Sequence, residues 1–244
     1  TADRTDSLFI LMGPEGNGNF RGLYRYLWSA TGNNGFTLVT NTPNVLNGAN
    51  DGSGDGGFAW WAIGIGVNRT NSAQVLVGGV IGRRSTNGGQ TITAAHGLLH
   101  ADIHGYFQNP LNNWVYCAHD GGISRSKDYG STWTTLSAGL HVTQYYRIST
   151  VPNSSNIVLG GTQDNGHHVK YTNTSAFRWS LTCCDGMDNA INPDNPGIIY
   201  MSSQRGGLNR SVDSGKTWTA IRTNASSWVA PILLHSTTPT TIFK

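Results

Sequence analysis

One sequence segment occurs twice in nearly the same form, and this repetition constrains the fold more than any other feature. The copies are Gly121–Trp133 and Gly206–Trp218, and both read Ser-x-Asp-x-Gly-x-Thr-Trp after a Gly-Gly-apolar-x-Arg lead. Their serines, Ser126 and Ser211, lie 85 residues apart, which is twice a period of about 42. Such a period is typical of an array of supersecondary units, each too small to bury a core alone.

Weaker copies stand where this period requires them. Ser85–Ile92 lies 41 residues before Ser126 and carries Asn for Asp and Ile for Trp, while Tyr171–Trp179 falls between the two good copies. A more distant copy combines Gly22–Arg25 with Phe36–Val39. The repeat therefore extends along most of the chain.

A second marker repeats out of phase with the first. Apolar segments run into turns at Arg69, Pro110, Pro152, Pro193 and Ser236, with steps of 41, 42, 41 and 43 residues. Two markers with one period support the same repeating unit.

Each unit reads as four short strands. In the unit beginning near Asp102 we expect Ile103–Phe107, Trp114–Ala118, Gly122–Ser126 and Thr132–Leu136, separated by Gly, Asn, Asp and Pro turns. Gly occupies 32 of the 244 positions and charged residues only 12%, which also favours strands joined by tight turns. Four antiparallel strands in about 42 residues are typical of a β-propeller blade. We therefore predict an all-β fold.

We expect one β-propeller domain over residues 1–244. Its predicted parts are a partial blade at 1–50, blades near 57–98, 99–140, 141–182 and 183–224, and the start of another blade at 225–244. This is roughly six blades' worth of chain, and its two ends repeat rather than complement each other. We therefore expect the chain to be part of a larger ring.

The repeated segment resembles the Asp-box, or BNR repeat, of sialidases, xyloglucanases and sortilin-type receptors. The wider sequence is similar to large secreted propeller proteins of Bacteroidota-type bacteria. The segments that carry this similarity are His100–His104, His119–Ser126, Gly139–Tyr146, Gly160–Gly166 and Asp185–Asp188. The resemblance covers residues 57–220 and implies a propeller that is secreted by a bacterium to the cell surface or beyond. It also places the segment at 100–104 on the innermost strand of a blade.

The best-kept residues of the repeat are expected to be structural. A carboxylate in a tight hairpin can accept hydrogen bonds from the backbone of its own turn, Gly tolerates positive φ, and Trp buries a large surface between blades. The residues concerned are Ser126, Asp128, Gly130 and Trp133 in one copy, and Ser211, Asp213, Gly215 and Trp218 in the other.

His100, Asp102 and His104 are candidate metal ligands. On a strand, alternate side chains share a face, so these three would project together. Two imidazoles and a carboxylate are a ligand set for Zn²⁺. The alternative is a hydrogen-bonded polar lining.

Equivalent positions of successive blades converge around a propeller axis, so their polar and aromatic side chains are candidates for a binding site. The candidate ligand-binding residues are Trp61, His104, Tyr145, Gln163, Asp164 and Trp228, and the candidate catalytic carboxylates are Asp102, Asp185 and Asp188. Convergent carboxylates with aromatics suit carbohydrate binding or, at the right spacing, glycoside hydrolysis. The alternative is a polar, hydrated axis without a ligand.

Two further features concern metals and cysteines. Asp51–Gly57 has oxygen-bearing residues at alternate positions, as a Ca²⁺ loop does, but lacks the Glu that closes an EF-hand. Of the three cysteines, Cys183 and Cys184 are adjacent, so we expect Cys117 to pair with one of them.

Composition and motifs exclude several function classes. The net charge is +3 without a basic run, so no nucleic-acid partner is expected. No apolar stretch is long enough for membrane insertion. The Phe-Arg-Ile-Pro segment of sialidases is absent.

We therefore expect a non-catalytic structural or binding module of the adhesin or filament type, with other domains or subunits of a surface assembly, or glycans, as partners. The alternative is a glycoside hydrolase acting on polysaccharide.

Overall fold

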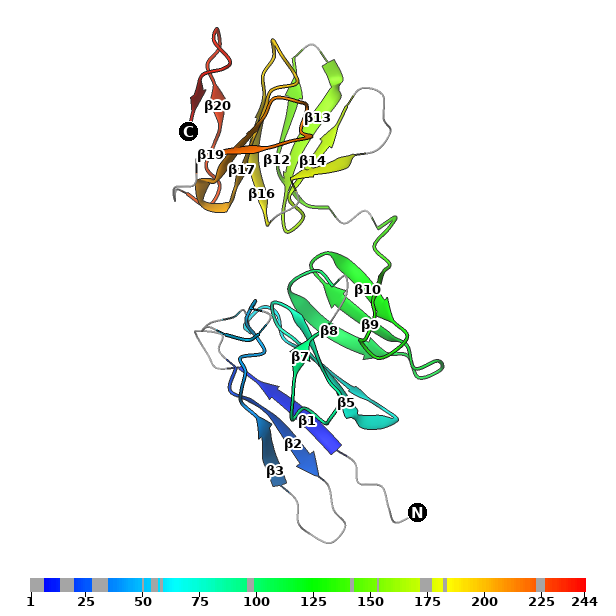
Figure 1. The fold of residues 1–244 in the computed structure, drawn as a ribbon. Helices are drawn as coiled ribbons and strands as arrows, with labels where there is room; N and C mark the ends of the chain where they lie inside the picture. The colour runs from blue at the N-terminus through cyan, green and yellow to red at the C-terminus, as the bar shows by residue number, and fades with distance from the viewer. Residues whose placement is uncertain are drawn as a thin grey trace. The chain divides into compact units, whose positions relative to one another are not determined.

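In the computed structural model the regular elements are almost all short antiparallel strands (Figure 1). The described residues are 7–13, 20–27, 35–49, 51–53, 57, 59–95, 99–140, 143–152, 154–171, 177–181, 184–222 and 227–244. A short 3₁₀ helix, η1 (Gln204–Gly206), interrupts them near the C-terminal end. No helix within the described ranges is long and apolar enough to cross a membrane.

Four sheets have four strands each, and the strands of each sheet pair in chain order. Their members are β4 (Gly64–Asn68), β5 (Asn71–Gly78), β6 (Gly82–Ser85) and β7 (Thr93–Ala94); β8 (Ile103–Gln108), β9 (Val115–His119), β10 (Gly122–Ser126) and β11 (Thr134–Thr135); β12 (Tyr145–Val151), β13 (Ser154–Thr162), β14 (His167–Lys170) and β15 (Arg178–Leu181); and β16 (Gly186–Ile191), β17 (Ile199–Ser203), β18 (Leu208–Ser211) and β19 (Thr219–Arg222). Their first strands are offset by 39, 42 and 41 residues, which confirms the repeat of about 42.

Two smaller sheets come before and after these four. The first contains β1 (Ser7–Met12), β2 (Gly22–Leu27) and β3 (Gly35–Thr40), and the last contains β20 (Leu233–Leu234) and β21 (Ile242–Phe243). All-β architecture from four-stranded antiparallel units is therefore confirmed. The fourth copy of the repeat includes residues 172–176, which lie outside the described part of the chain.

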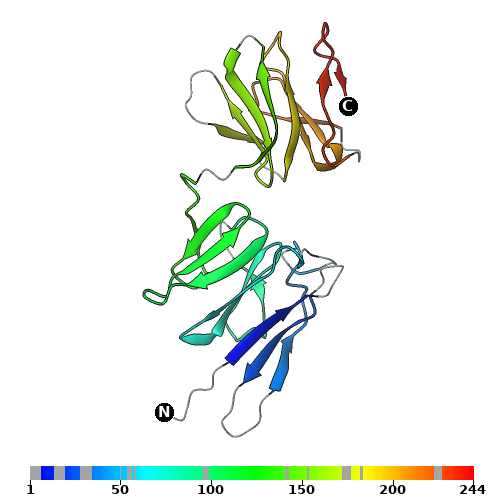
Figure 2. The same cartoon turned by 180° about the vertical axis from the view of Figure 1, so that it is seen from behind.

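The chain divides into two compact units, residues 1–140 and 141–244, which Figures 1 and 2 show from opposite sides. Within each unit the hydrophobic core lies between neighbouring sheets. Leu23, Val75 and Val77 belong to the cluster that joins the β1–β3 sheet to the β4–β7 sheet. In the second unit Leu159 and Met201 belong to the cluster that joins the β12–β15 and β16–β19 sheets. Within a unit, neighbouring sheets thus bury a face against each other, as blades do.

Cys117 belongs to a third such cluster and is not part of a disulfide. This residue of β9 is a free thiol with no exposed surface, packed with Leu76, Ile103 and Trp133. Cys184 is disulfide-bonded, and Cys183, the remaining cysteine of the sequence, lies outside the described residues. The predicted pairing of Cys117 with one of the other two is therefore wrong, because Cys117 points into the core of its own unit.

The repeated turn between the third and fourth strands of a blade is held by its own side chains. The Ser126 hydroxyl donates to Asp128 Oδ1 at 2.8 Å and accepts the Gly130 N–H at 2.7 Å. The Asp128 carboxylate accepts the N–H of Thr132 at 2.8 Å and its hydroxyl at 2.6 Å. The turn thereby satisfies backbone donors that a tight turn would otherwise leave unpaired.

The other two described copies use the same scheme. The Ser211–Asp213–Thr217 turn repeats these bonds at 2.6–2.9 Å. In the weaker copy the Asn87 carbonyl accepts the Ser85 hydroxyl at 2.9 Å, and its amide N–H donates to the Thr91 hydroxyl at 2.9 Å. Asn can replace Asp in this turn, because the threonine hydroxyl can act as acceptor as well as donor.

Candidate functional site

The first strand of the β8–β11 blade contains a β-bulge. Ile103 lies opposite His119 and Gly105 lies opposite Ala118, so His104 is an extra residue in β8. A bulge bends the strand and changes the direction of the extra side chain. His104 is therefore directed differently from its neighbours on the strand.

Two blades of the second unit have a bulge at the same place. In β12 the register shifts between Tyr145 and Arg147, which makes Tyr146 the extra residue, 42 positions after His104. In β16 the register shifts between Gly186 and Asn189. The recurrence marks this end of the first strands as the place where blades present individual side chains.

In the first unit, His104 lies between an acidic residue and an exposed aromatic pair. Its Nε2 is hydrogen-bonded to Oδ1 of Asp120, which sits in the turn between β9 and β10. The rings of Trp61 and His104 meet edge to face, with their planes at 85° and their centroids 5.6 Å apart. The ring centroids of Trp60 and Trp61 are 6.3 Å apart, and the two residues are 71% and 54% exposed. Two large rings therefore face solvent beside a His–Asp pair.

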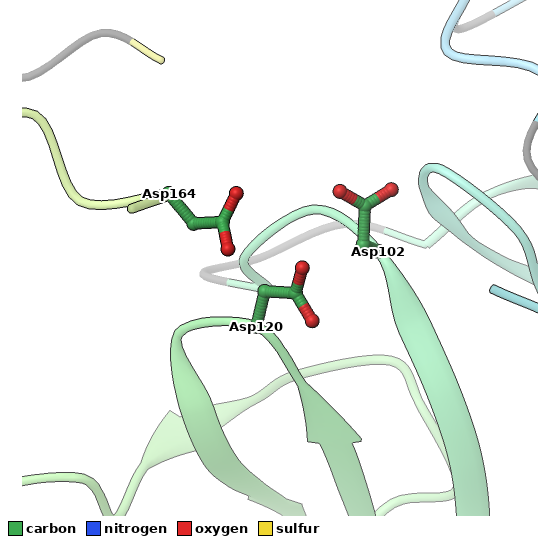
Figure 3. A group of neighbouring side chains, drawn as sticks. All are labelled: Asp102, Asp120 and Asp164. Atoms are coloured by element: carbon green, nitrogen blue, oxygen red, sulfur yellow. The ribbon is translucent and has the colours of Figure 1, made fainter. Parts of the chain in front are cut away.

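Asp102 precedes β8 and is fixed by its backbone. It has a φ of 62°, and its N–H donates to the carbonyl of Val80 at 2.8 Å, while Ile103 N–H donates to Gly79 at 2.9 Å. These bonds fasten the turn to the preceding blade. An oxygen of Asp102 lies within 4.8 Å of an oxygen of Asp120, and Figure 3 shows both carboxylates at the same end of their blade. Two carboxylates thus lie close to His104.

His100, Asp102 and His104 do not form the expected strand face. β8 begins only at Ile103, and His104 is displaced by the bulge. The His100 ring instead stacks on the ring of His119, with centroids 6.0 Å apart and planes 18° from parallel. In the described part of the first unit, no three His, Cys, Asp or Glu side chains bring ligand atoms within 4.8 Å of one another. The predicted strand arrangement is wrong because the bulge interrupts the alternation on which it depends.

His119 lies behind this cluster and is kept neutral. Its Nε2 is 2.9 Å from the Ser124 hydroxyl, and the residue is buried. The pKa of His119 is lowered to about 4, mainly by burial and also by His100 and His104, while the Asp120 charge acts in the opposite direction. His119 is therefore an uncharged support for His100 near neutral pH.

The second unit builds a separate polar cluster around Asp185. This buried carboxylate accepts the N–H of Asp164 at 2.7 Å through Oδ1 and the Tyr146 hydroxyl at 3.5 Å through Oδ2. The Trp228 side chain is hydrogen-bonded to Tyr146 and is half exposed. Burial raises the pKa of Tyr146, the Trp228 bond opposes this shift, and the charges of Asp185 and Asp164 add to it. Gln163 belongs to the same turn as Asp164, between β13 and β14.

Tyr145 and Asp188 lie apart from that cluster. The Tyr145 hydroxyl is 3.2 Å from Nδ1 of His168, and its ring packs over Gly160. The Asp188 carboxylate accepts the backbone N–H groups of Asn189 at 2.9 Å and Ile232 at 2.7 Å. Its second bond reaches the segment that enters β20, so both oxygens of Asp188 hold backbone.

The Asp51–Gly57 segment is described only in part, because residues 54–56 lie outside the described ranges. Asp51 Oδ1 accepts the Ser53 N–H at 2.9 Å, and this bond lowers the pKa of Asp51. The described residues thus show a turn that is closed by its own side chain.

Sequence reasoning missed two residues of these clusters, Asp120 and Tyr146. Asp120 lies in the turn between the second and third strands of its blade, and the corresponding turn of the next blade carries Asp164. That equivalence is the signal that could have identified it. Tyr146 was passed over for Tyr145, because only the bulge makes the second tyrosine face Asp185.

Comparison with known proteins identifies the fold and no family. No family model matches the chain, and no curated protein matches it. The solved GH74 enzyme of Niastella koreensis is similar, with a TM-score of 0.57 and 18% identity over 93% of this chain and 36% of that one. The sheets are β-propeller blades. The chain spans about a third of the length of that enzyme.

Two further structures have lower similarity. The GH74 xyloglucanase of Xanthomonas campestris has a TM-score of 0.35 at 14% identity, over 94% of this chain and 40% of that one. A chain of the nidogen/laminin complex has a TM-score of 0.37 at 11% identity, over 96% of this chain and 83% of that one.

Proposed function

We propose that this chain is a non-catalytic, carbohydrate-binding propeller module. The observation that carries the proposal is the exposed Trp60–Trp61 pair beside the hydrogen-bonded His104 and Asp120. Large exposed aromatic rings next to a few fixed polar groups mark binding sites. The rings offer an apolar surface for the C–H faces of a sugar, and the His–Asp pair offers a donor and acceptors for its hydroxyl groups.

The proposal includes a cellular setting. The low charge, the Asp-box-like turns and the resemblance to secreted bacterial propellers support a location at the cell surface or outside the cell. Other domains or subunits of a surface assembly, and glycans, are the partners that we propose. In this proposal Ser126, Asp128, Ser211 and Asp213 brace the blades and do not contact the ligand.

A glycan array with the purified chain tests the proposal. We expect binding to neutral oligosaccharides, and we expect Trp61→Ala or His104→Ala to weaken it at least tenfold, which is about 1.4 kcal/mol. Phe107→Ala is the matched control, because Phe107 is also an exposed aromatic residue and lies further along β8. Absence of binding to every glycan, or equal losses in all three variants, would contradict the proposal.

Glycoside hydrolysis is the second candidate, and the observation that favours it is the closeness of Asp102 and Asp120. Retaining glycosidases place two carboxyl groups about 5 to 5.5 Å apart. The similarity in fold to a GH74 enzyme adds support. If this candidate is right, the chain releases reducing ends from xyloglucan, and Asp120→Asn and Asp102→Asn each lower the rate at least about 100-fold. If the wild-type chain binds but releases none, the binding module stands.

A further inference from the structure

The β6–β7 turn lacks two aromatic rings that the corresponding turn of the next blade carries. Where the β10–β11 turn has Tyr129 and Trp133, the β6–β7 turn has Gly88 and Ile92. Tyr129 and Trp133 are both buried and pack together in one core cluster. Ile92 still packs into the core between the β1–β3 and β4–β7 sheets, whereas Gly88 leaves the position of the Tyr129 ring without a side chain.

A pocket of about 270 Å³ lies beside this turn, between it and the β2 and β3 strands of the first sheet. Its polar wall includes Arg25, Thr37 and Gln90, and its apolar wall includes Leu27, Leu38 and Val39. Gly88 also lines it, and a Cβ atom added there would come no closer to another residue than 3.9 Å, to the Ser72 carbonyl. The missing side chain at position 88 therefore opens onto free space.

The lining has the chemistry of a site for a small hydroxylated anion. Arg25 is the charged side chain among the lining residues, and a guanidinium binds a planar carboxylate through two parallel N–H donors. Thr37 and Gln90 can bond hydroxyl groups, and the aliphatic wall can take the C–H face of a ring. The Arg25 guanidinium lies over the ring of Phe9, 5.5 Å from its centroid, and Asn87 is hydrogen-bonded within its own turn, where it shapes the pocket.

We propose that this pocket binds a sugar acid of the uronic-acid class, with the carboxylate on Arg25 and the ring against Leu38 and Val39. The volume suits a single sugar ring, since pockets for drug-sized ligands begin at about 300 Å³. The site does not depend on the Trp60–Trp61 cluster, so its failure and the failure of the proposed function are separate outcomes.

Two substitutions separate the pocket from the rest of the fold. Gly88→Tyr restores the ring of the neighbouring blade at a lining position. Gly88 has a φ of 71°, but Tyr129 and Ser214 occupy the corresponding positions at 54° and 62°, so this turn accepts side chains there. Arg25→Gln removes the charge and keeps a long polar side chain. Ser214→Tyr is the matched control, because it adds the same ring to the equivalent turn of another blade.

The experiment is ligand-observed NMR titration of the full chain with glucuronate and galacturonate, with glucose and acetate as reference ligands. We expect binding of at least one uronate, at least tenfold weaker in Arg25→Gln and lost in Gly88→Tyr, and unchanged in Ser214→Tyr and Trp61→Ala. No binding of either uronate to the wild-type chain overturns the proposal.

Unchanged binding in Gly88→Tyr also overturns it, because the ligand is then elsewhere. If glucose binds as tightly as the uronates, the carboxylate has no role in binding. If acetate binds as tightly as the uronates, the sugar ring has none. Thermal melting of each variant shows whether a loss of binding reflects a loss of folding. If only Gly88→Tyr unfolds, Arg25→Gln tests the proposal: tenfold weaker uronate binding supports it, and unchanged binding overturns it.

Discussion

At the scale of the residue, a buried histidine makes the stability of the chain depend on pH. His167 on β14 is 1% exposed, and burial lowers its pKa to about 4, with the charge of His168 adding to the shift and the backbone of Asp188 opposing it. In the unfolded chain a histidine titrates near 6.5. Between these two values the unfolded state binds the proton and the folded state does not, so the native state loses stability as pH falls.

We predict that His167 leaves the free energy of unfolding of the chain nearly unchanged above about pH 7 and lowers it by about 3 kcal/mol toward pH 4. The His167→Leu variant should flatten this dependence, since leucine has no proton to take up. Urea denaturation at pH 7 and at pH 4.5 measures the free energy of unfolding of both proteins at each pH. An equal change in the free energy of unfolding of the two proteins between these pH values would show that His167 does not cause the effect.

At the scale of the element, the repeated turns depend on how each tryptophan uses its indole N–H. Trp218 donates it to the carbonyl of Ser180, on β15, at 2.9 Å. The Trp133 indole nitrogen is buried and has no hydrogen-bond partner among the described residues. The two turns thus share a sequence and differ in the bond between blades.

We predict that Trp218→Phe destabilises the chain by about 1 kcal/mol more than Trp133→Phe does. Both changes remove the same volume, but only the first breaks a hydrogen bond, and the second also removes an unpaired N–H group. Thermal unfolding of both variants, followed by near-UV circular dichroism, compares them. Equal losses would mean that the Ser180 bond adds nothing.

The elements also show how far sequence could lead. The period of 42 predicted four-stranded blades because hydrophobic alternation and turn residues are local properties. Strand alternation gave the wrong direction for His104 and no signal for Tyr146. Each is an inserted residue of a β-bulge, and where a bulge forms depends on pairing with the second strand. The His100–Asp102–His104 set was therefore expected on one face and is divided, while Asp120 enters the site from a turn. Alternation predicts a regular strand, and the candidate sites lie where the strands are irregular.

The whole molecule contains several small cores rather than one. Within the first unit, one cluster lies between the β1–β3 and β4–β7 sheets, and another lies between the β4–β7 and β8–β11 sheets. The second unit has its own clusters around Leu159 and around Tyr200. Neighbouring blades stabilise each other through these cores, so they should unfold together. Local opening should therefore expose a whole interface between two sheets.

Cys117 reports such opening in the first unit. It has no exposed surface in the β8–β11 blade. Its pKa is raised to about 12, because burial outweighs the opposing effect of the neighbouring Tyr106 hydroxyl. A thiol in an unfolded chain has a pKa of about 8.5 and reacts as the thiolate. We predict that a thiol reagent at pH 8 labels the native chain only as fast as the interface around Cys117 opens, and that labelling accelerates with urea in step with loss of near-UV circular dichroism. Cys117→Ser, with Cys184 still in its disulfide, is the control and should remain unlabelled in native buffer. Rapid labelling of Cys117 without denaturant would show that the core between the β4–β7 and β8–β11 sheets is open in solution.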